Sequence, residues 1–279
     1  MTPLVIENND IKTFIDKSLL SKDFFLKELA ENGLIVLKKA KYDSFFLLDF
    51  AKKIGKIRIH DVNGIKNSLP GCKEIMLVGN KKYDENSKGC ETTIGTWHTD
   101  YAFKLNTDCP TILKCKKTPK NGAYTSYVFT PDLFDSLDEN LKDRLRNYKM
   151  IFDYTYFYEK YADDKRTPLT NEMKQALKPI EKNLVIKHPI SGRECLFICF
   201  ESGRKIKDVS DKESDFIIKS LFEIVDDYKF SYEHKWDEDD ILMWDNRCML
   251  HKGKPYNYNQ VRELHRITVE SDYSFGNYI

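Results

Sequence analysis

Short apolar segments separated by turn residues are the feature that most constrains the fold of this chain. Strand-like runs recur along most of it, at residues 34–40, 73–78, 111–117 and 241–244. The runs LVIKHP and ECLFICF are joined by a Ser-Gly turn, which indicates a hairpin. Helical spacing is confined to a few places, at residues 21–31, 44–54, 131–148 and 212–228. We therefore predict a mainly β protein with helical decoration, a double-stranded β-helix or jelly roll.

Domain organisation follows from the same pattern. The chain has 279 residues, a length that all-β barrels with helical decoration reach as one unit. No repeat, low-complexity tract or clear linker divides it, and no glycine-rich nucleotide-binding motif follows any strand. We predict a single domain over residues 1–279, with a helical insertion at about 131–182.

Charge and cysteine content restrict the partners and the compartment. The 45 basic and 44 acidic residues nearly cancel, which favours neither nucleic acid nor an anionic membrane as a partner. No apolar run approaches the roughly 18 residues that span a bilayer, and the N-terminus does not resemble a secretion signal. The seven cysteines form no CxxC pair and are read as reduced thiols. We expect a cytoplasmic protein with a small-molecule substrate; a homo-oligomer is compatible with the sequence.

The segment Trp97-His98-Thr99-Asp100 contains side chains of the kinds that bind metal ions. Side chains alternate along an extended chain, so His98 and Asp100 point to the same face and can meet one metal ion. A third ligand is needed, and His251, which follows an apolar strand and a turn-like Asp-Asn-Arg, is a natural candidate. Two histidines and one carboxylate leave coordination positions open, the arrangement that suits ferrous oxygenases, whereas structural zinc asks for a closed tetrahedral set. An isolated His-x-Asp pair is nevertheless common by chance.

The wider context of these residues resembles the taurine dioxygenase family of iron(II)- and 2-oxoglutarate-dependent oxygenases. The resemblance is carried by Gly-Thr-Trp-His-Thr-Asp at 95–100, by Trp-Asp-Asn-Arg at 244–247 with His251 four residues on, and by Arg-Glu-Leu-His-Arg-Ile-Thr-Val at 262–269. Weaker likenesses lie at residues 31–37, 54–56 and 188–193. Together they cover about residues 25 to 270 in the family's order.

The resemblance assigns roles to single residues. It implies that His98, Asp100 and His251 bind Fe(II) and that Arg262 binds the distal carboxylate of the cosubstrate 2-oxoglutarate. A guanidinium suits that role because it can form two parallel charge-assisted hydrogen bonds with a carboxylate. Thr125 matches a family threonine that binds the same carboxylate. The chain has Ala-Tyr-Thr there in place of Gly-Asp-Thr, and Thr125 can equally be read as an ordinary strand residue.

Three further residues bear on the substrate. Arg266 matches a position that contacts an anionic group of the substrate in the taurine and clavaminate branches of the family. A buried guanidinium there needs an anionic or carbonyl partner, and we expect the substrate to supply it. His60 matches a substrate-contacting histidine of the taurine branch, although a structural histidine is the commoner case. Tyr101, directly after Asp100, is expected to wall the pocket.

The implied reaction consumes O2 and converts 2-oxoglutarate into succinate and carbon dioxide while the substrate is oxidised. Hydroxylation of a sulfonate, amino acid or other small carboxylate is the default outcome, and desaturation or oxidative rearrangement stays open. Halogenation is disfavoured because Asp100 stands where halogenases leave room for halide. Two alternatives from other classes also stay open: a catalytically silent jelly-roll sensor of a metal or anion, and a metal-dependent hydrolase or isomerase on a similar barrel, which would not need Arg262.

Overall fold

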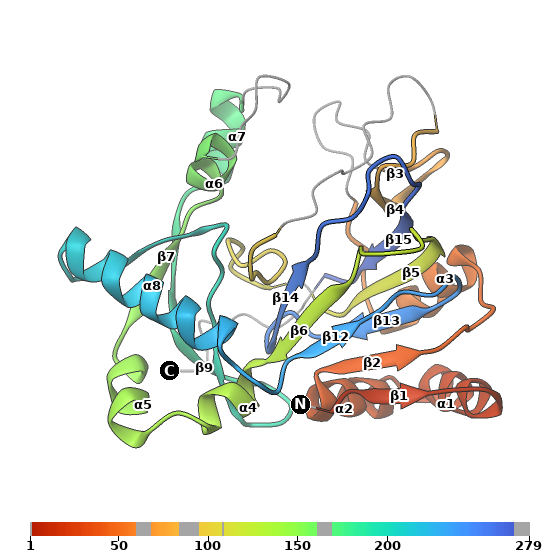
Figure 1. The fold of residues 1–279 in the computed structure, drawn as a ribbon, viewed down its shortest axis with the longest axis horizontal. Helices are drawn as coiled ribbons and strands as arrows, with labels where there is room; N and C mark the ends of the chain where they lie inside the picture. The colour runs from red at the N-terminus through yellow and green to blue at the C-terminus, as the bar shows by residue number, and fades with distance from the viewer. Residues whose placement is uncertain (1, 60–67, 84–94, 108, 161–168, 271–279) are drawn as a thin grey trace.

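The computed structural model describes residues 2–59, 68–83, 95–107, 109–160 and 169–270 (Figure 1). His60, one of the expected substrate contacts, lies outside these ranges. No helix in the described parts of the chain is long and apolar enough to cross a membrane.

A seven-stranded sheet forms the larger half of the fold. Every neighbouring pair is antiparallel except the first two strands, which are parallel. Across the sheet the strands run in the order β1 (Leu4–Ile6), β2 (Leu34–Leu37), β13 (Ile241–Trp244), β5 (Thr111–Lys117), β15 (Glu263–Thr268), β4 (Cys72–Gly79) and β3 (Ser68–Leu69).

Both faces of this sheet are covered, which explains its continuous apolar strands. Ile35 and Leu37 of β2 pack on one face with the N-terminal helices α1 (Asn9–Leu20), α2 (Lys22–Asn32) and α3 (Ser44–Ile54). Leu34 and Val36 belong to the core on the other face. Alternate residues of one strand thus enter two different hydrophobic cores, as the period of two requires.

The smaller sheets face that second core. One contains β12 (Tyr232–His234), β6 (Thr125–Phe129) and β14 (Met249–Gly253), with β6 in the middle. The predicted hairpin is present as β9 (Val185–Lys187) and β10 (Glu194–Leu196). A third small sheet has the order β11 (Gly203–Ile206), β7 (Lys149–Phe152) and β8 (Ile180–Asn183). In Figure 1, β6 and β14 lie between the larger sheet and β7 with α8 (Asp211–Asp226). The predicted jelly-roll class is confirmed.

Capping residues set the ends of the early helices where the sequence predicted them. The hydroxyl of Ser21 accepts a hydrogen bond from the backbone N–H of Phe24 at 3.1 Å, and the carboxylate of Asp43 accepts one from Phe46 at 2.8 Å. Gly33 ends α2 with a φ of 71°, a conformation that favours glycine. These local signals explain why α3 has its predicted bounds and why each end of α2 lies one residue from the predicted one.

The region 131–182 is less purely helical than we expected. The predicted helix at 131–148 is two helices, α4 (Thr130–Asp135) and α5 (Glu139–Arg146), because Asp138 caps a new helix through the N–H of Leu141. Helices α6 (Tyr154–Lys160) and α7 (Asn171–Ala176) follow, but strands β7 and β8 lie in the same stretch. The sequence did not predict these strands, because neither has a clean alternation of apolar and polar residues and the surrounding segment is charged and rich in tyrosine.

Candidate metal centre

His98 and His251 come together through a backbone bridge between two segments that are far apart in the sequence. The N–H of His98 donates to the carbonyl of His251 at 3.0 Å, and the N–H of His251 donates back at 2.8 Å. Their ring centroids are 4.0 Å apart. His251 lies within strand β14, which pairs with β6, whereas the sequence indicated only a turn before it.

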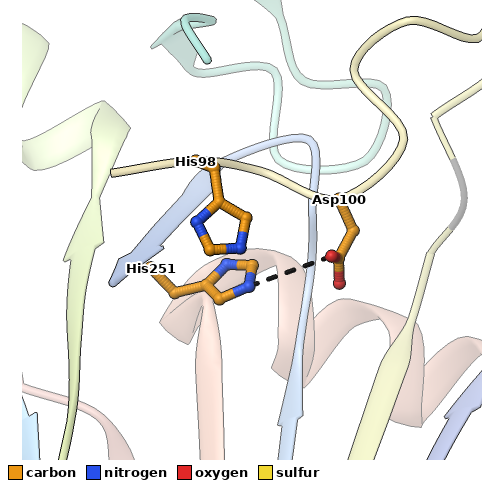
Figure 2. A group of neighbouring side chains, drawn as sticks. All are labelled: His98, Asp100 and His251. Atoms are coloured by element: carbon orange, nitrogen blue, oxygen red, sulfur yellow. Dashed lines mark ion pairs between the residues drawn. The ribbon is translucent and has the colours of Figure 1, made fainter. Parts of the chain in front are cut away.

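Asp100 completes the group, as Figure 2 shows. One ligand atom from each of His98, Asp100 and His251 lies within 4.8 Å of the other two. Nε2 of His251 and Oδ1 of Asp100 are 4.0 Å apart. The intervening Thr99 points elsewhere, and its hydroxyl donates to the carbonyl of Asn246 at 2.5 Å. The alternation expected for His98 and Asp100 therefore holds, and both face the same point.

The two imidazoles are prepared for metal binding in different ways. Nδ1 of His98 is 2.9 Å from the carbonyl of Thr96 and 3.6 Å from Oε1 of Glu201. Donation from Nδ1 leaves Nε2 as the ligand atom, which is the usual outer-shell arrangement of a metal-binding histidine. Burial and then the neighbouring His98 hold the pKa of His251 well below its ordinary value. His251 is therefore neutral at physiological pH, as a ligand must be.

Arg262 is a buried cation beside this centre. Its residue is 6% exposed, its Nε has no hydrogen-bond partner, and no carboxylate among the described residues pairs with its guanidinium. Burial lowers its pKa, but an arginine stays protonated in proteins. The guanidinium lies 5.7 Å from the ring centroid of Tyr256. A buried guanidinium without an ion-pair partner is costly, and an anion bound to it would relieve that cost.

The backbone of Arg262 is positioned by residues that the sequence analysis did not single out. The N–H of Arg262 donates to Oδ1 of Asn80 at 2.8 Å, and the N–H of Asn80 donates to the carbonyl of Arg262 at 3.1 Å. Gly79 has a φ of 125°, and a Cβ on it would collide with that carbonyl. These contacts become visible only in the structure, where β4 lies close to β15. In the sequence, the Gly-Asn pair indicates no more than the start of a loop.

Arg266 has a protein partner, which corrects part of our reasoning. Its Nη1 donates to Oδ1 of Asp100 at 3.1 Å, and its Nη2 donates to the hydroxyl of Tyr101 at 2.9 Å. We expected a substrate anion to pair with this guanidinium, but Asp100 already pairs with its Nη1. Burial alone therefore does not require Arg266 to bind substrate.

The remaining predicted residues lie near the same place. Tyr101 is half-buried, and the cationic groups of Arg58, Lys104 and Arg266 lie 5.0, 4.8 and 5.6 Å from its ring centroid. Thr125 is buried at the start of β6, and its hydroxyl accepts a hydrogen bond from Nε1 of Trp236 at 3.0 Å. That hydroxyl keeps its own hydrogen for donation.

A second buried cluster contains ligand-type side chains that the sequence did not bring together: His188, Asp245 and Cys248. The carboxylate of Asp245 already accepts from Nε of Arg247 at 2.9 Å and lies 3.0 Å from Nε2 of His188. Although burial opposes ionisation, Arg247 and His188 hold the pKa of Asp245 well below its usual range. We interpret this cluster as a buried ion-pair centre, because its acceptor oxygens are occupied.

Comparisons with known proteins find similarity along nearly the whole chain. A family model described as "Taurine catabolism dioxygenase TauD, TfdA family" matches residues 7–268. The alpha-ketoglutarate-dependent 2,4-dichlorophenoxyacetate dioxygenase of Cupriavidus pinatubonensis is 29% identical, over 63% of this chain and 60% of that protein. The alpha-ketoglutarate-dependent sulfonate dioxygenase of Saccharomyces cerevisiae is 25% identical, over 91% of this chain and 61% of that protein.

Among solved structures, the chain is similar to AAD-2 in complex with Mn(II) and N-oxalylglycine. The TM-score is 0.74 at 22% identity, covering 90% of this chain and 88% of that one. This match shows a shared fold. The chain spans about three fifths of the length of the two curated relatives.

Proposed function

Because the chain belongs to the TauD, TfdA family of taurine catabolism dioxygenases, we propose that it is an iron(II)- and 2-oxoglutarate-dependent dioxygenase acting on a small anionic substrate. The observation that carries the proposal is the meeting of His98, Asp100 and His251 within 4.8 Å, together with the buried guanidinium of Arg262, whose Nε has no hydrogen-bond partner. A metal hydrolase would use the first three residues but has no need of the fourth.

The residues fit the groups that this activity requires. Two imidazoles and one carboxylate are the donor set of ferrous oxygenases, and they leave positions for further ligands. Bound iron and dioxygen supply the oxidising power: one oxygen atom enters the substrate C–H bond, and the other enters succinate as 2-oxoglutarate loses carbon dioxide. In the proposal Arg262 binds the distal carboxylate of 2-oxoglutarate, and Thr125 donates its hydroxyl hydrogen to the same group.

Arg266 has two roles in the proposal. Its bond to Oδ1 of Asp100 holds that carboxylate in place, because a charge-assisted hydrogen bond restricts the rotation of the carboxylate. In its second role Arg266 joins Arg58 and Lys104 around the ring of Tyr101. Arg58 pairs with Glu270 and Arg266 with Asp100, so three cations stand against two carboxylates there, and the excess of positive charge favours an anionic substrate. The curated relatives are named for a sulfonate and a chlorophenoxyacetate, both anions, which supports this class. His60 stays a proposed substrate contact.

The test is a substrate screen with the metal-loaded enzyme. The protein is reconstituted anaerobically with Fe(II) and 2-oxoglutarate, given oxygen, and presented with sulfonates, aryloxyacetates, amino acids and matched neutral amides. We expect succinate release in step with oxidation of one of the anions. Turnover of a neutral compound alone would contradict the anionic class, and the absence of any 2-oxoglutarate-dependent oxygen uptake would contradict the reaction.

A further inference from the structure

Tyr127 has a buried hydroxyl that the described fold does not use. It is the middle residue of β6, its exposed fraction is 0%, and its hydroxyl has no hydrogen-bond partner. Leaving a polar group unsatisfied in the interior costs roughly 1–3 kcal/mol. Phenylalanine would fill the same space without that cost, so the hydroxyl needs an explanation beyond packing.

The position of Tyr127 directs it toward the metal centre. In the pairing of β6 with β14 it stands directly opposite His251, and their rings lie nearly parallel with centroids 6.1 Å apart. Residues opposite each other in an antiparallel pair point to the same face, as do residues two apart along one strand. Tyr127 therefore shares a face with both His251 and Thr125.

The same hydroxyl lies within electrostatic reach of Arg262 and Asp100. A phenol has an ordinary pKa of about 10 and is neutral at physiological pH, so it can donate a hydrogen bond. Nε of Arg262 and the hydroxyl of Tyr127 are both buried donors without a hydrogen-bond partner. A carboxylate is the acceptor that satisfies both, because its two oxygens accept several hydrogen bonds.

We propose that Tyr127 is a further cosubstrate-binding residue, whose hydroxyl donates a hydrogen bond to the carboxylate of 2-oxoglutarate that Arg262 holds. This inference rests on the proposed function. The phenol adds a short directional bond to the charge attraction of Arg262, so that it favours a 2-oxo acid with a distal carboxylate over one without. In the absence of the cosubstrate, the hydroxyl is left with no bond.

The experiment compares two 2-oxo acids of equal chain length in the metal-loaded protein without oxygen. 2-Oxoglutarate has the distal carboxylate, and 2-oxopentanoate has a methyl group there. Calorimetric titration gives the dissociation constant of each for the unmodified protein, for Tyr127→Phe and for a control, Tyr232→Phe. Tyr232 stands opposite Tyr127 on β12, but its hydroxyl is 3.1 Å from Nδ1 of His234 and has a protein partner.

We expect Tyr127→Phe to weaken 2-oxoglutarate binding about tenfold and to change 2-oxopentanoate binding less than about twofold. Retained 2-oxopentanoate binding reports an intact metal pocket. Tyr232→Phe should leave both constants unchanged. Unchanged 2-oxoglutarate affinity in Tyr127→Phe, or equal weakening for the two acids, would overturn the inference while the proposed function stands. If the unmodified protein binds neither acid, both fail together.

Discussion

Two buried clusters in this protein contain the same kinds of side chain and treat them in opposite ways. In the ion-pair centre, the side chains of His188, Asp245 and Arg247 are 0–3% exposed and are bonded to one another. In the metal centre, the Nε of Arg262 and the hydroxyl of Tyr127 are equally hidden from water but have no partner. One cluster is complete without a ligand, and the other is not.

The difference separates stability from function on physical grounds. A buried charge is tolerated when its hydrogen-bonding capacity is filled, and a filled cluster has nothing to offer a ligand. Buried groups without hydrogen-bond partners reduce the stability of the ligand-free protein. A complementary ligand that bonds to them restores that stability. Proximity of histidine, carboxylate and cysteine therefore does not by itself identify a metal site.

The largest expected effect comes from removing the carboxylate ligand. Asp100→Ala should reduce succinate production about a thousandfold or more, equal to about 4 kcal/mol of activation free energy, because iron loses one of its three protein ligands. The circular dichroism spectrum should not change. Asp211→Ala, at a carboxylate that is 87% exposed, is the control. Undiminished succinate production in Asp100→Ala would refute the ligand assignment.

A substitution in the ion-pair centre should reduce the stability of the protein, whereas Asp100→Ala reduces its activity. Asp245→Asn should reduce the free energy of unfolding by about 3–5 kcal/mol, because it leaves the Arg247 guanidinium buried without its carboxylate. Urea unfolding of Asp245→Asn and Tyr127→Phe in the metal-free protein measures the contrast. The second variant should lose far less, because it removes a hydroxyl that has no hydrogen-bond partner. Similar losses in the two variants would remove the distinction between the clusters.

The third prediction tests the unpaired guanidinium. Arg262→Lys keeps the positive charge but loses the two-pronged geometry, so 2-oxoglutarate should bind about 10- to 100-fold more weakly, a loss of about 1.5–3 kcal/mol. The Michaelis constant of the main substrate should change much less. Arg204→Lys, where the side chain is 54% exposed, is the matched control. An effect confined to the main substrate would mean that the roles of Arg262 and Arg266 are reversed.

The smallest effect concerns a second self-satisfied carboxylate. Burial opposes the ionisation of Asp240, but hydrogen bonds from His234, Lys38 and the backbone lower its pKa to about 2. In the unfolded chain the pKa is about 3.9. The lowered pKa contributes about 2 kcal/mol of stability above about pH 4, which is lost as the pH falls toward 2. Urea unfolding across this range should show a steeper pH dependence than in Asp240→Asn. Equal slopes would contradict the prediction.

Local sequence patterns were sufficient for the features that depend on neighbouring residues. Ser21, Asp43 and Gly33 set helix ends through contacts within a few residues, and the prediction of α2 and α3 was correct for that reason. His98 and Asp100 share a face because side chains alternate along an extended segment. The strand pattern predicted the jelly-roll fold, the position of His251 after a strand and a turn made it the candidate third ligand, and the family resemblance added Arg262.

Tertiary structure alone decided which polar groups satisfy one another. The pairing of β14 with β6 brings Tyr127 opposite His251, and the pairing of β15 with β4 and β5 brings Arg266 to Asp100. Such contacts depend on strand register, and a shift of one residue would turn each side chain to the other face. The sequence by itself therefore determined the candidate ligands, and the fold determined which buried charges are paired and which remain for a ligand.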